Sequence, residues 1–369
     1  MRIRFLTATI EPGRDGIGDY TMRLAEKCRG HGHTIDIVAF NDRHARETEH
    51  TPELLRLPCT TPWPDRLHQF EQWHKSAPDW TSLQFAPYAL HKKGLVGGWI
   101  NRLSALITHP LHLFAHEIWI GQDAGDPLRH KLVGLIQRAY IKSLFRALAP
   151  QVIHTSNAFY AECLGREGFA ARVLPLLGSV PFERGDSGEA ERKLLRQLGL
   201  GSRSEAWLFG IFGTLHPVWP PEPLLTRLIE AGAQNHRKIC LLSLGRIGSG
   251  QPLWDRMKKE YAGRIQLFQL GELPVRELSA IFQALDFGIA TTPYEILGKS
   301  SAVAVMREHG LPIIVNRISE PPPESLPPDI ITPRSLRRLK TEKHGAPADP
   351  DVVVDQFLSS IGNRTRQPA

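Results

Sequence analysis

A short loop late in the chain combines a lysine with two hydroxyl side chains. Its residues are Gly298, Lys299, Ser300 and Ser301. The loop follows an apolar run at residues 287–290 and precedes a helical pattern at residues 302–306. A lysine charge, hydroxyl groups and free backbone N–H groups at the start of a helix stabilise a bound phosphate. We therefore predict that this loop binds the diphosphate of a nucleotide.

Two other interpretations of the loop stay open. The residues could form an ordinary capped helix start with a solvated lysine. They could also belong to a Walker A loop, but that pattern needs glycine where Pro293 stands, and proline cannot adopt a positive φ. The Walker A interpretation is therefore the weaker of the two.

Arg246 is a second candidate phosphate ligand. It lies between Gly245 and Gly248, directly after an apolar run at residues 238–244. A guanidinium group can bind two phosphate oxygens at once. The alternative is a surface arginine in a loop, which the sequence leaves open.

The first half of the chain has its own candidates. Gly16 and Gly18 follow the first apolar run, where glycine lets a ligand or another part of the chain approach the backbone. Steric packing alone would also explain them.

His116 and Glu117 directly follow the run at residues 111–115 and are placed for acid/base chemistry. A histidine hydrogen-bonded to a neighbouring loop is the alternative.

These residues need parallel strands and helices to position them. Residues 286–315 have the order strand, loop, helix, strand, with Gly310 and Pro312 ending the helix. The same rhythm occurs in both halves of the chain. We predict an α/β fold of two Rossmann-like domains facing a cleft, over residues 1–182 and 183–345. Residues 346–369 are expected to form a helix and tail that pack back toward the N-terminal domain.

Composition excludes several classes of protein. The chain has 369 residues, a formal charge of +7 and four scattered cysteines without metal-ligand spacing. No segment approaches the roughly 20 apolar residues that cross a bilayer. We expect a cytoplasmic protein that binds no nucleic acid and no metal. We expect residues 95–106 to form an amphipathic helix. Peripheral membrane contact is left open, through this helix and the basic Lys92, Lys93 and Arg102.

Together the motifs resemble the GT-B glycosyltransferases, in particular the bacterial group called family 4. The likeness covers nearly the whole chain. It depends on the glycine turn at Gly16 and Gly18, on His116-Glu117-Ile-Trp119, on residues 174–181 and 271–274, and on the unit at residues 286–315. The resemblance implies a nucleotide diphosphate-sugar as co-substrate, bound by the C-terminal domain. It also implies an acceptor with a hydroxyl group, bound by the N-terminal domain.

Further expectations follow from the resemblance. Transfer of a hexosyl or related group would need no metal and no other cofactor, and retention of configuration is the tendency of the group. Catalytic roles would fall on His116 and Glu117. Neighbours of the donor site would be Thr214, His216, Trp219 and Glu295.

The sequence also departs from the family pattern. Two glutamates are usual where this chain has Leu297 and Val305, while Glu295 and Glu308 lie nearby out of register. Donor recognition must therefore differ. The alternative function is a non-catalytic GT-B protein that binds a nucleotide or supports a partner transferase. The sequence names neither the sugar nor the acceptor, which could be a glycan, a lipid or a small molecule.

Overall fold

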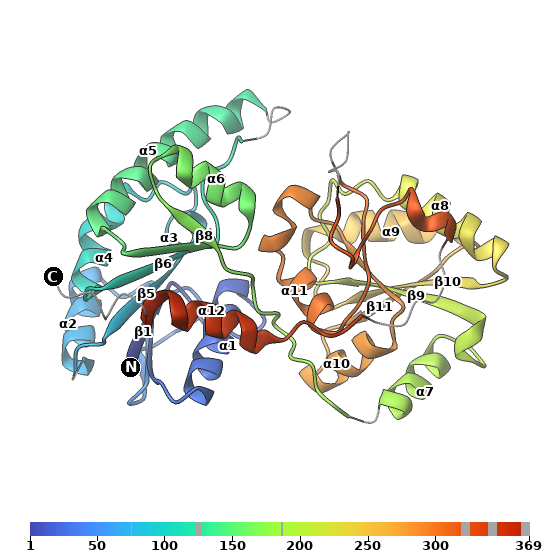
Figure 1. Cartoon of the computed structure of the whole chain (residues 1–369), viewed down its shortest axis with the longest axis horizontal. Helices are drawn as coiled ribbons and strands as arrows, with labels where there is room; N and C mark the ends of the chain where they lie inside the picture. Colours follow the sequence, from blue (N-terminus) through green and yellow to red (C-terminus); the bar gives the residue numbers. More distant parts are fainter. Residues whose placement is uncertain (75, 123–126, 186, 319–324, 339–344, 363–369) are drawn as a thin grey trace. The chain divides into compact units, whose positions relative to one another are not determined.

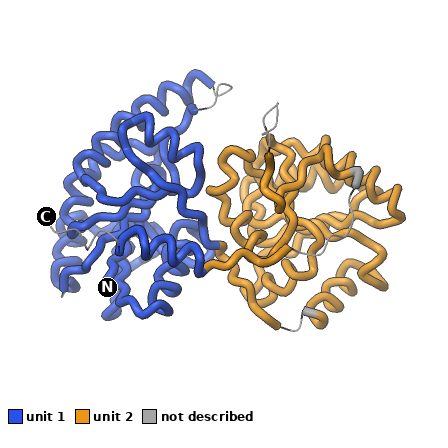
Figure 2. Tube along the Cα trace, in the orientation of Figure 1, with its two compact units in different colours: residues 1–177, 351–369 blue, residues 178–350 orange. Residues whose placement is uncertain are grey.

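The computed structural model describes residues 1–74, 76–122, 127–185, 187–318, 325–338 and 345–362. The chain divides into two compact units (Figure 2). One unit consists of Met1–Leu177 with Asp351–Ala369, and the other of Gly178–Pro350. We expected the division after residue 182, and we expected the final helix to return to the first domain. In the structure, the chain from Asp351 onward belongs to the first unit.

The first unit contains an eight-stranded sheet in the order β3-β4-β2-β1-β5-β6-β7-β8. Its strands are parallel except for the β3–β4 pair. Near-continuous apolar runs form strands of this kind because both faces of the sheet are covered. The strands are β1 (Arg2–Thr7), β2 (Thr34–Asp42), β3 (Glu49–His50), β4 (Leu54–Pro58), β5 (Trp80–Phe85), β6 (Leu111–Ala115), β7 (Val152–Thr155) and β8 (Ala171–Val173).

Helices link these strands. They are α1 (Gly16–Gly30), α2 (Trp63–Trp73), α3 (Pro87–Leu90), the 3-10 turn η1 (Gly97–Trp99), α4 (Ile100–Leu106), α5 (Leu128–Leu148), α6 (Ala158–Arg166) and the returning α12 (Pro350–Gly362). The side chain of Asp15 caps α1 by accepting from the backbone N–H groups of Ile17 and Gly18. Phe357 of α12 packs its ring 6.0 Å from that of Phe5 in β1. Figure 1 shows α12, in red, lying beside α1 and β1.

The second unit has a six-stranded sheet in the order β11-β10-β9-β12-β13-β14, and all its pairs are parallel. Its strands are β9 (Ala206–Phe212), β10 (Lys238–Leu244), β11 (Gln266–Gly271), β12 (Phe287–Ala290), β13 (Ile313–Val315) and β14 (Ile330–Ile331). Its helices and turns are α7 (Ser187–Gln197), η2 (Arg203–Glu205), α8 (Glu222–Gln234), η3 (Gly248–Gly250), α9 (Gln251–Glu260), α10 (Val275–Ala284), η4 (Tyr294–Lys299), α11 (Ser301–Glu308) and η5 (Ser335–Arg338).

The strand–loop–helix–strand order predicted for residues 286–315 is confirmed. β12 leads through η4 into α11, and β13 pairs in parallel with β12. Gly310 has a φ of 67° just after α11, where a helix commonly ends on a left-handed glycine.

Two segments of the first unit differ from what their sequence patterns indicate. Residues 95–106 do not form one helix, because the 3-10 turn η1 precedes α4. The proline-rich stretch from residue 50 to 80 has no clear apolar period in the sequence, and it contains β4 and α2. Pro64 near the start of α2 is compatible with a helix, since the first N–H groups of a helix have no internal partner. No helix in the described part of the chain is long and apolar enough to cross a membrane.

Candidate functional site

The carboxyl edge of the second sheet has a reversal of strand order. From β9 the chain continues to β10 and β11 on one side, and then to β12, β13 and β14 on the other. Open α/β sheets bind ligands at such a switch point, just outside the carboxyl ends of the strands. His216 follows β9 and Lys299 follows β12, so the loops of these two residues leave the sheet on either side of the switch.

His216 lies near two cations at this edge. Partial desolvation of its ring, and then the charges of Arg317 and Lys299, lower the pKa of His216. Its Nδ1 accepts a hydrogen bond from the backbone N–H of Val218 at 3.4 Å, so Nε2 carries the proton of the neutral ring. A neutral donor and two cations on exposed or half-buried side chains make this edge suited to an anionic ligand.

Arg317 was missed by the sequence analysis. It follows β13 at the same carboxyl edge, and its Nη1 donates to the backbone oxygen of Thr291 at 3.3 Å. The available signal was the pair Asn316-Arg317 directly after an apolar run. Arg246 has the same position relative to β10.

The loop at residues 298–301 forms the start of α11. Ser300 is the N-cap, and its hydroxyl accepts from the backbone N–H of Val303 at 3.4 Å. Lys299 is half-buried. Gly298 and Lys299 are the last two residues of the preceding turn, η4. Ser301 is the first residue of the helix. The capped helix start is therefore present, and the lysine beside it lies near His216.

Arg246 follows β10, one strand away from β9. Its Nε pairs with Oε1 of Glu272 at 3.1 Å, and its side chain is 36% exposed. A phosphate at this place would have to compete with that carboxylate.

The remaining predicted neighbours of the donor site differ in their surroundings. Thr214 is exposed and packs near Gly248, and Glu295 is exposed on η4. Trp219 lies in the hydrophobic core at 1% exposure, with its Nε1 donating to Oδ1 of Asn316 at 2.6 Å. The Trp219 indole therefore packs the core and is not available to a ligand, because no face of it is open.

The positions of the usual family glutamates are also core positions. Leu297 is 4% exposed and Val305 is fully buried. A Cβ atom on Gly178 would lie 2.7 Å from the backbone nitrogen of Val305, so the chain passes tightly over this part of α11. Glu308, one turn later, accepts a hydrogen bond from the backbone N–H of Gly178 at 2.7 Å. Glu308 thus holds the first residue of the second unit, Gly178, against α11.

In the first unit, His116 lies at the carboxyl end of β6 and is buried. Its ring stacks on Phe114 at 4.2 Å between centroids and meets the edge of Tyr20 at 5.0 Å. Nε2 of His116 bonds to Oε1 of Gln84 at 2.9 Å. Burial lowers the pKa of His116 to about 3, so the imidazole is neutral at physiological pH.

A chain of buried hydrogen bonds continues from His116 across the sheet. Gln84 Nε2 donates to Ser82 Oγ at 2.9 Å, and Ser82 Oγ bonds to His112 Nδ1 at 2.8 Å. His112 Nε2 bonds to His154 Nδ1 at 3.0 Å. Because the amide of Gln84 donates onward, its oxygen must accept from Nε2–H of His116. Nδ1 of His116 is therefore the unprotonated nitrogen.

Among the described residues, no hydrogen bond joins the side chains of Glu117 and His116. The ring of His116 bonds instead to Gln84. Glu117 is half-buried beside it in the chain. The two residues are neighbours at the same strand end but do not form a bonded pair.

The two predicted glycines have different surroundings. A Cβ atom on Gly18 would lie 2.7 Å from the backbone oxygen of Thr9 and 2.8 Å from Cα of Ile10. Gly18 is therefore required for the packing of α1 against the loop that follows β1. Gly16 has open space where a Cβ atom would be. Of the two, only Gly16 leaves room for a ligand.

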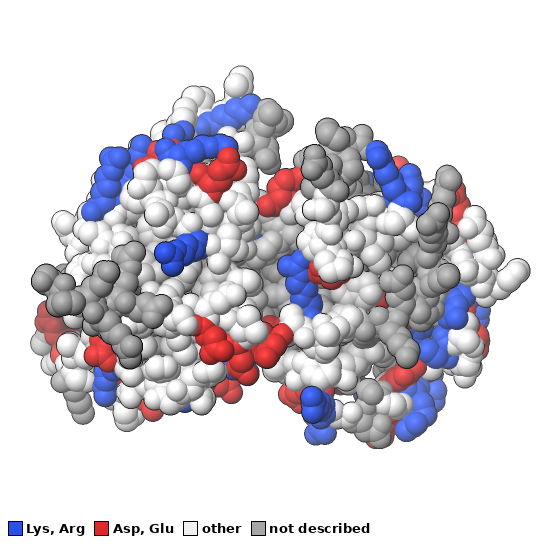
Figure 3. Space-filling view, viewed as in Figure 1, with Lys and Arg blue, Asp and Glu red and all other residues white. Residues whose placement is uncertain are grey.

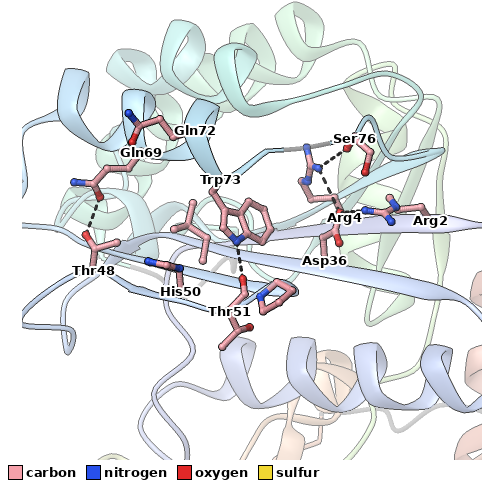
Figure 4. A pocket seen from close by; sticks show the side chains of 12 residues that line it. Arg2, Arg4, Asp36, Thr48, His50, Thr51, Gln69, Gln72, Trp73 and Ser76 are labelled. Atoms are coloured by element: carbon pink, nitrogen blue, oxygen red, sulfur yellow. Dashed lines mark hydrogen bonds and ion pairs between the residues drawn. The ribbon is translucent and has the colours of Figure 1, made fainter.

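A cavity of about 980 Å³ lies elsewhere in the first unit (Figure 4). Arg2 and Arg4 from the start of β1 line it, with Trp73 from the end of α2. Buried Arg4 pairs with Asp36 at 3.3 Å. The cavity is therefore at the amino ends of the strands, opposite the edge that bears His116, and its described lining includes none of the predicted site residues.

Comparisons with known proteins extend this description. No protein-family model matches the sequence, and no curated protein matches it. Solved structures do match. Anabaena HepE, in complex with UDP and glucose, is 15% identical with a TM-score of 0.62, over 98% of this chain and 100% of that chain.

Two other solved structures match over similar lengths. The α,α-trehalose-phosphate synthase (UDP-forming) of Burkholderia xenovorans is 11% identical with a TM-score of 0.53, over 98% of this chain and 99% of that one. WaaG, a glycosyltransferase involved in lipopolysaccharide biosynthesis, is 11% identical with a TM-score of 0.55, over 99% and 95%. The predicted fold class is confirmed: the chain has the α/β fold of the GT-B glycosyltransferases, with two Rossmann-like domains.

Proposed function

We propose that the protein is a glycosyltransferase that moves a sugar from a nucleotide diphosphate-sugar to a hydroxyl-bearing acceptor. The observation that carries the proposal is the group formed by His216, Lys299 and Arg317 at the switch point of the second sheet. The solved structure of HepE, which has a similar fold, holds UDP and glucose. We infer a similar donor, with UDP as the first nucleotide to test.

In this proposal, the two cations and the start of α11 stabilise the diphosphate. Negative charge builds up on the diphosphate as the bond to the sugar breaks. Fixed positive groups that lie near this charge lower the barrier to transfer. Metal independence is proposed on the same ground. Ser300 and Ser301 would add donors, and Arg246 would contribute only after releasing Glu272.

His116 would serve the acceptor side. Its Nδ1 is an acceptor, because Nε2–H is engaged with Gln84. A ring with a pKa of about 3 is a weak base, so we propose that His116 orients the acceptor hydroxyl by a hydrogen bond. Glu117 is the nearby carboxylate that could take up a proton. Transfer of a hexosyl or related group with retention of configuration is part of the proposal.

Calorimetry with UDP tests the donor site. Lys299→Ala should weaken UDP binding by roughly ten- to a hundredfold, because a hydrogen bond to a charged group typically contributes about 1.5–3 kcal/mol. The matched control is Lys259→Ala, which removes an exposed lysine of α9 in the same unit. Equal UDP affinity in wild type and Lys299→Ala would contradict the proposal.

A second function is favoured by Leu297 and Val305. These apolar core residues stand where the family usually has glutamates, so the chain could bind a nucleotide without transferring a sugar. Incubation with several nucleotide-sugars separates the two functions. Release of UDP from one sugar donor, lost in Lys299→Ala, supports the enzyme. Tight UDP binding with no release from any donor supports the non-catalytic protein or a partner-supporting role.

A further inference from the structure

Helix α5 of the first unit has apolar residues on two opposite faces. One face packs inward through Gln137, Gly134 and four larger apolar residues, Ile141, Leu144, Phe145 and Leu148. The other carries five large apolar side chains that are open to solvent. They are Leu128 at 79% exposure, Leu132 at 63%, Leu135 at 58%, Ile136 at 50% and Tyr140 at 41%. We call these five residues the α5 apolar face.

The spacing places the five side chains on one stripe. Residues three or four positions apart lie on the same side of a helix, and this relation links Leu128 to Leu132, Leu132 to Leu135 and Ile136 to Tyr140. A helix that is apolar on both sides is normally covered on both sides. Scattered apolar residues on a surface need no explanation, but a continuous stripe of this kind indicates an interaction site.

The charged residues of α5 itself are all positive. Over its 21 residues α5 contains no aspartate or glutamate. Its cationic residues are Arg129, Lys131, Arg138, Lys142 and Arg146. Glu167 forms ion pairs with Arg138 and Lys142, and it carries only one negative charge against the five positive ones. Figure 3 shows blue side chains gathered over the region where Figure 1 places α5.

A hollow beside the stripe has the same charge. It has a volume of about 260 Å³ and reaches from Leu135 to Trp119. Lys131, Arg138 and Arg166 line it together with one carboxylate, Glu167. Glu167 pairs with Arg138, and Arg166 pairs with Glu162 of α6. An anionic group would be attracted to this hollow while apolar groups cover Leu135 next to it.

We propose that the α5 apolar face docks on an anionic lipid surface. Leucine and isoleucine side chains enter the boundary between headgroups and acyl chains, and the flanking arginines and lysines meet the negative headgroups. A second copy of this chain fits the face less well, because a two-fold contact would bring the same five cations together. The proposal goes beyond sugar transfer and does not depend on it.

The membrane contact expected from sequence lay on a different segment. In residues 95–106, Trp99, Leu103 and Leu106 are buried, and Trp99 packs against Phe40 and Trp63. That apolar face is internal. The proposal therefore moves membrane contact from α4 to α5.

Sedimentation of the full chain with vesicles tests the proposal at low salt. Binding is expected to phosphatidylglycerol-rich vesicles and to be much weaker to pure phosphatidylcholine. The double variant Leu132→Ser/Ile136→Ser should lower the partition into anionic vesicles by at least about tenfold, because it removes buried apolar area. Val352→Ser is the matched control, since Val352 is an apolar residue of α12 that is 52% exposed. It should bind as wild type does.

A second variant and a second measurement complete the test. Arg129→Glu/Arg146→Glu should reduce binding to anionic vesicles and leave the weak binding to neutral ones unchanged. Absence of sedimentation with anionic vesicles, or equal binding by the leucine–isoleucine variant, would overturn the proposal. So would a dimer of the free protein that the leucine–isoleucine variant dissociates. Vesicle binding needs no nucleotide, so its outcome is independent of the UDP experiment.

Discussion

His116 is held as a neutral ring by the packing around it. Phe114 and Tyr20 contact its faces and edge, and Gln84 binds its Nε2. His112 and His154 lie further along the same hydrogen-bonded chain, and burial lowers the pKa of both. Protonation of any of the three would place a charge inside the sheet without a compensating carboxylate in the described chain of bonds. The chain of bonds therefore requires neutral histidines.

This requirement predicts a pH dependence of stability. The folded pKa of His116 is about 3 against an ordinary value of 6.5, so below pH 6.5 the unfolded state binds more protons. Stability is therefore full above pH 6.5 and falls as the pH drops toward 3. At pH 5 the loss from His116 alone should be about 2 kcal/mol. Urea unfolding at pH 7.5 and pH 5 measures it.

The control for this experiment is His116→Gln. That variant has no group to titrate at position 116, so its stability should change less between the two pH values, by about 2 kcal/mol. Hydrogen exchange of β5 and β6 would attribute the change to the first unit. An equal pH dependence in both proteins would show that His116 does not contribute.

The pKa of His216 depends on the two cations beside it. Arg317 and Lys299 both lower its pKa, and Arg317 is the larger of the two charge effects. Arg317→Ala should therefore raise the pKa of His216, and Lys299→Ala should raise it less. Titration of the imidazole resonances by NMR measures both shifts. An unchanged His216 pKa in both variants would mean that the three groups do not lie together.

The start of α1 gives a prediction for a whole element. Gly18→Ala would force a Cβ atom to 2.7 Å from a backbone oxygen, and backbone cannot yield as a flexible side chain can. We expect a loss of about 1–3 kcal/mol in the free energy of unfolding. Gly16→Ala meets no atom and should change stability by less than about 0.5 kcal/mol. Denaturant unfolding of the two variants compares them directly.

A ligand role for Gly16 has a separate readout. If the open space at Gly16 admits a ligand, a larger residue such as valine should weaken donor or acceptor binding more than it changes stability. Equal binding by Gly16→Val would assign the glycine to the turn alone.

The elements that sequence could predict are those with strong local patterns. β6, α11 and β13 matched their expected places, because apolar runs, Gly310 and Pro312 mark their ends. α7 could not be predicted in this way, because its charged sequence is also typical of a linker. The exposed stripe of α5 could not be predicted either, because only the packed structure shows which of its two apolar faces is covered.

The candidate site could be predicted in part. Arg246 stands directly after β10, and Lys299 stands in the connection between β12 and α11, so both could be picked out from the chain order. His216 was expected only from the family resemblance. The bonding partners of His116 could not be found, because they depend on strand register. Ser82 pairs with His112 across β5 and β6, and a shift of one residue would separate them. Burial of Trp219 likewise depends on tertiary packing.

The return of α12 to the first unit predicts a stability effect at a distance in sequence. Phe357 packs 5.0 Å from His112 and 6.0 Å from Phe5, both in the first sheet. Phe357→Ala should cost about 3–5 kcal/mol, and the cost should fall on the first unit. Hydrogen exchange would then rise in β1 and β6 and not in β9 or β10. A rise confined to the second unit would contradict the assignment of α12.

This arrangement also orders events during synthesis. The ribosome delivers the strands of the first sheet early, but the helix that covers Phe5 and His112 emerges only after residues 178–350 have been made. Until then, part of the apolar surface of the nascent first unit must stay exposed to solvent or be covered by other contacts. The segment between has time to complete its own sheet first, so the domain begun earliest is finished last.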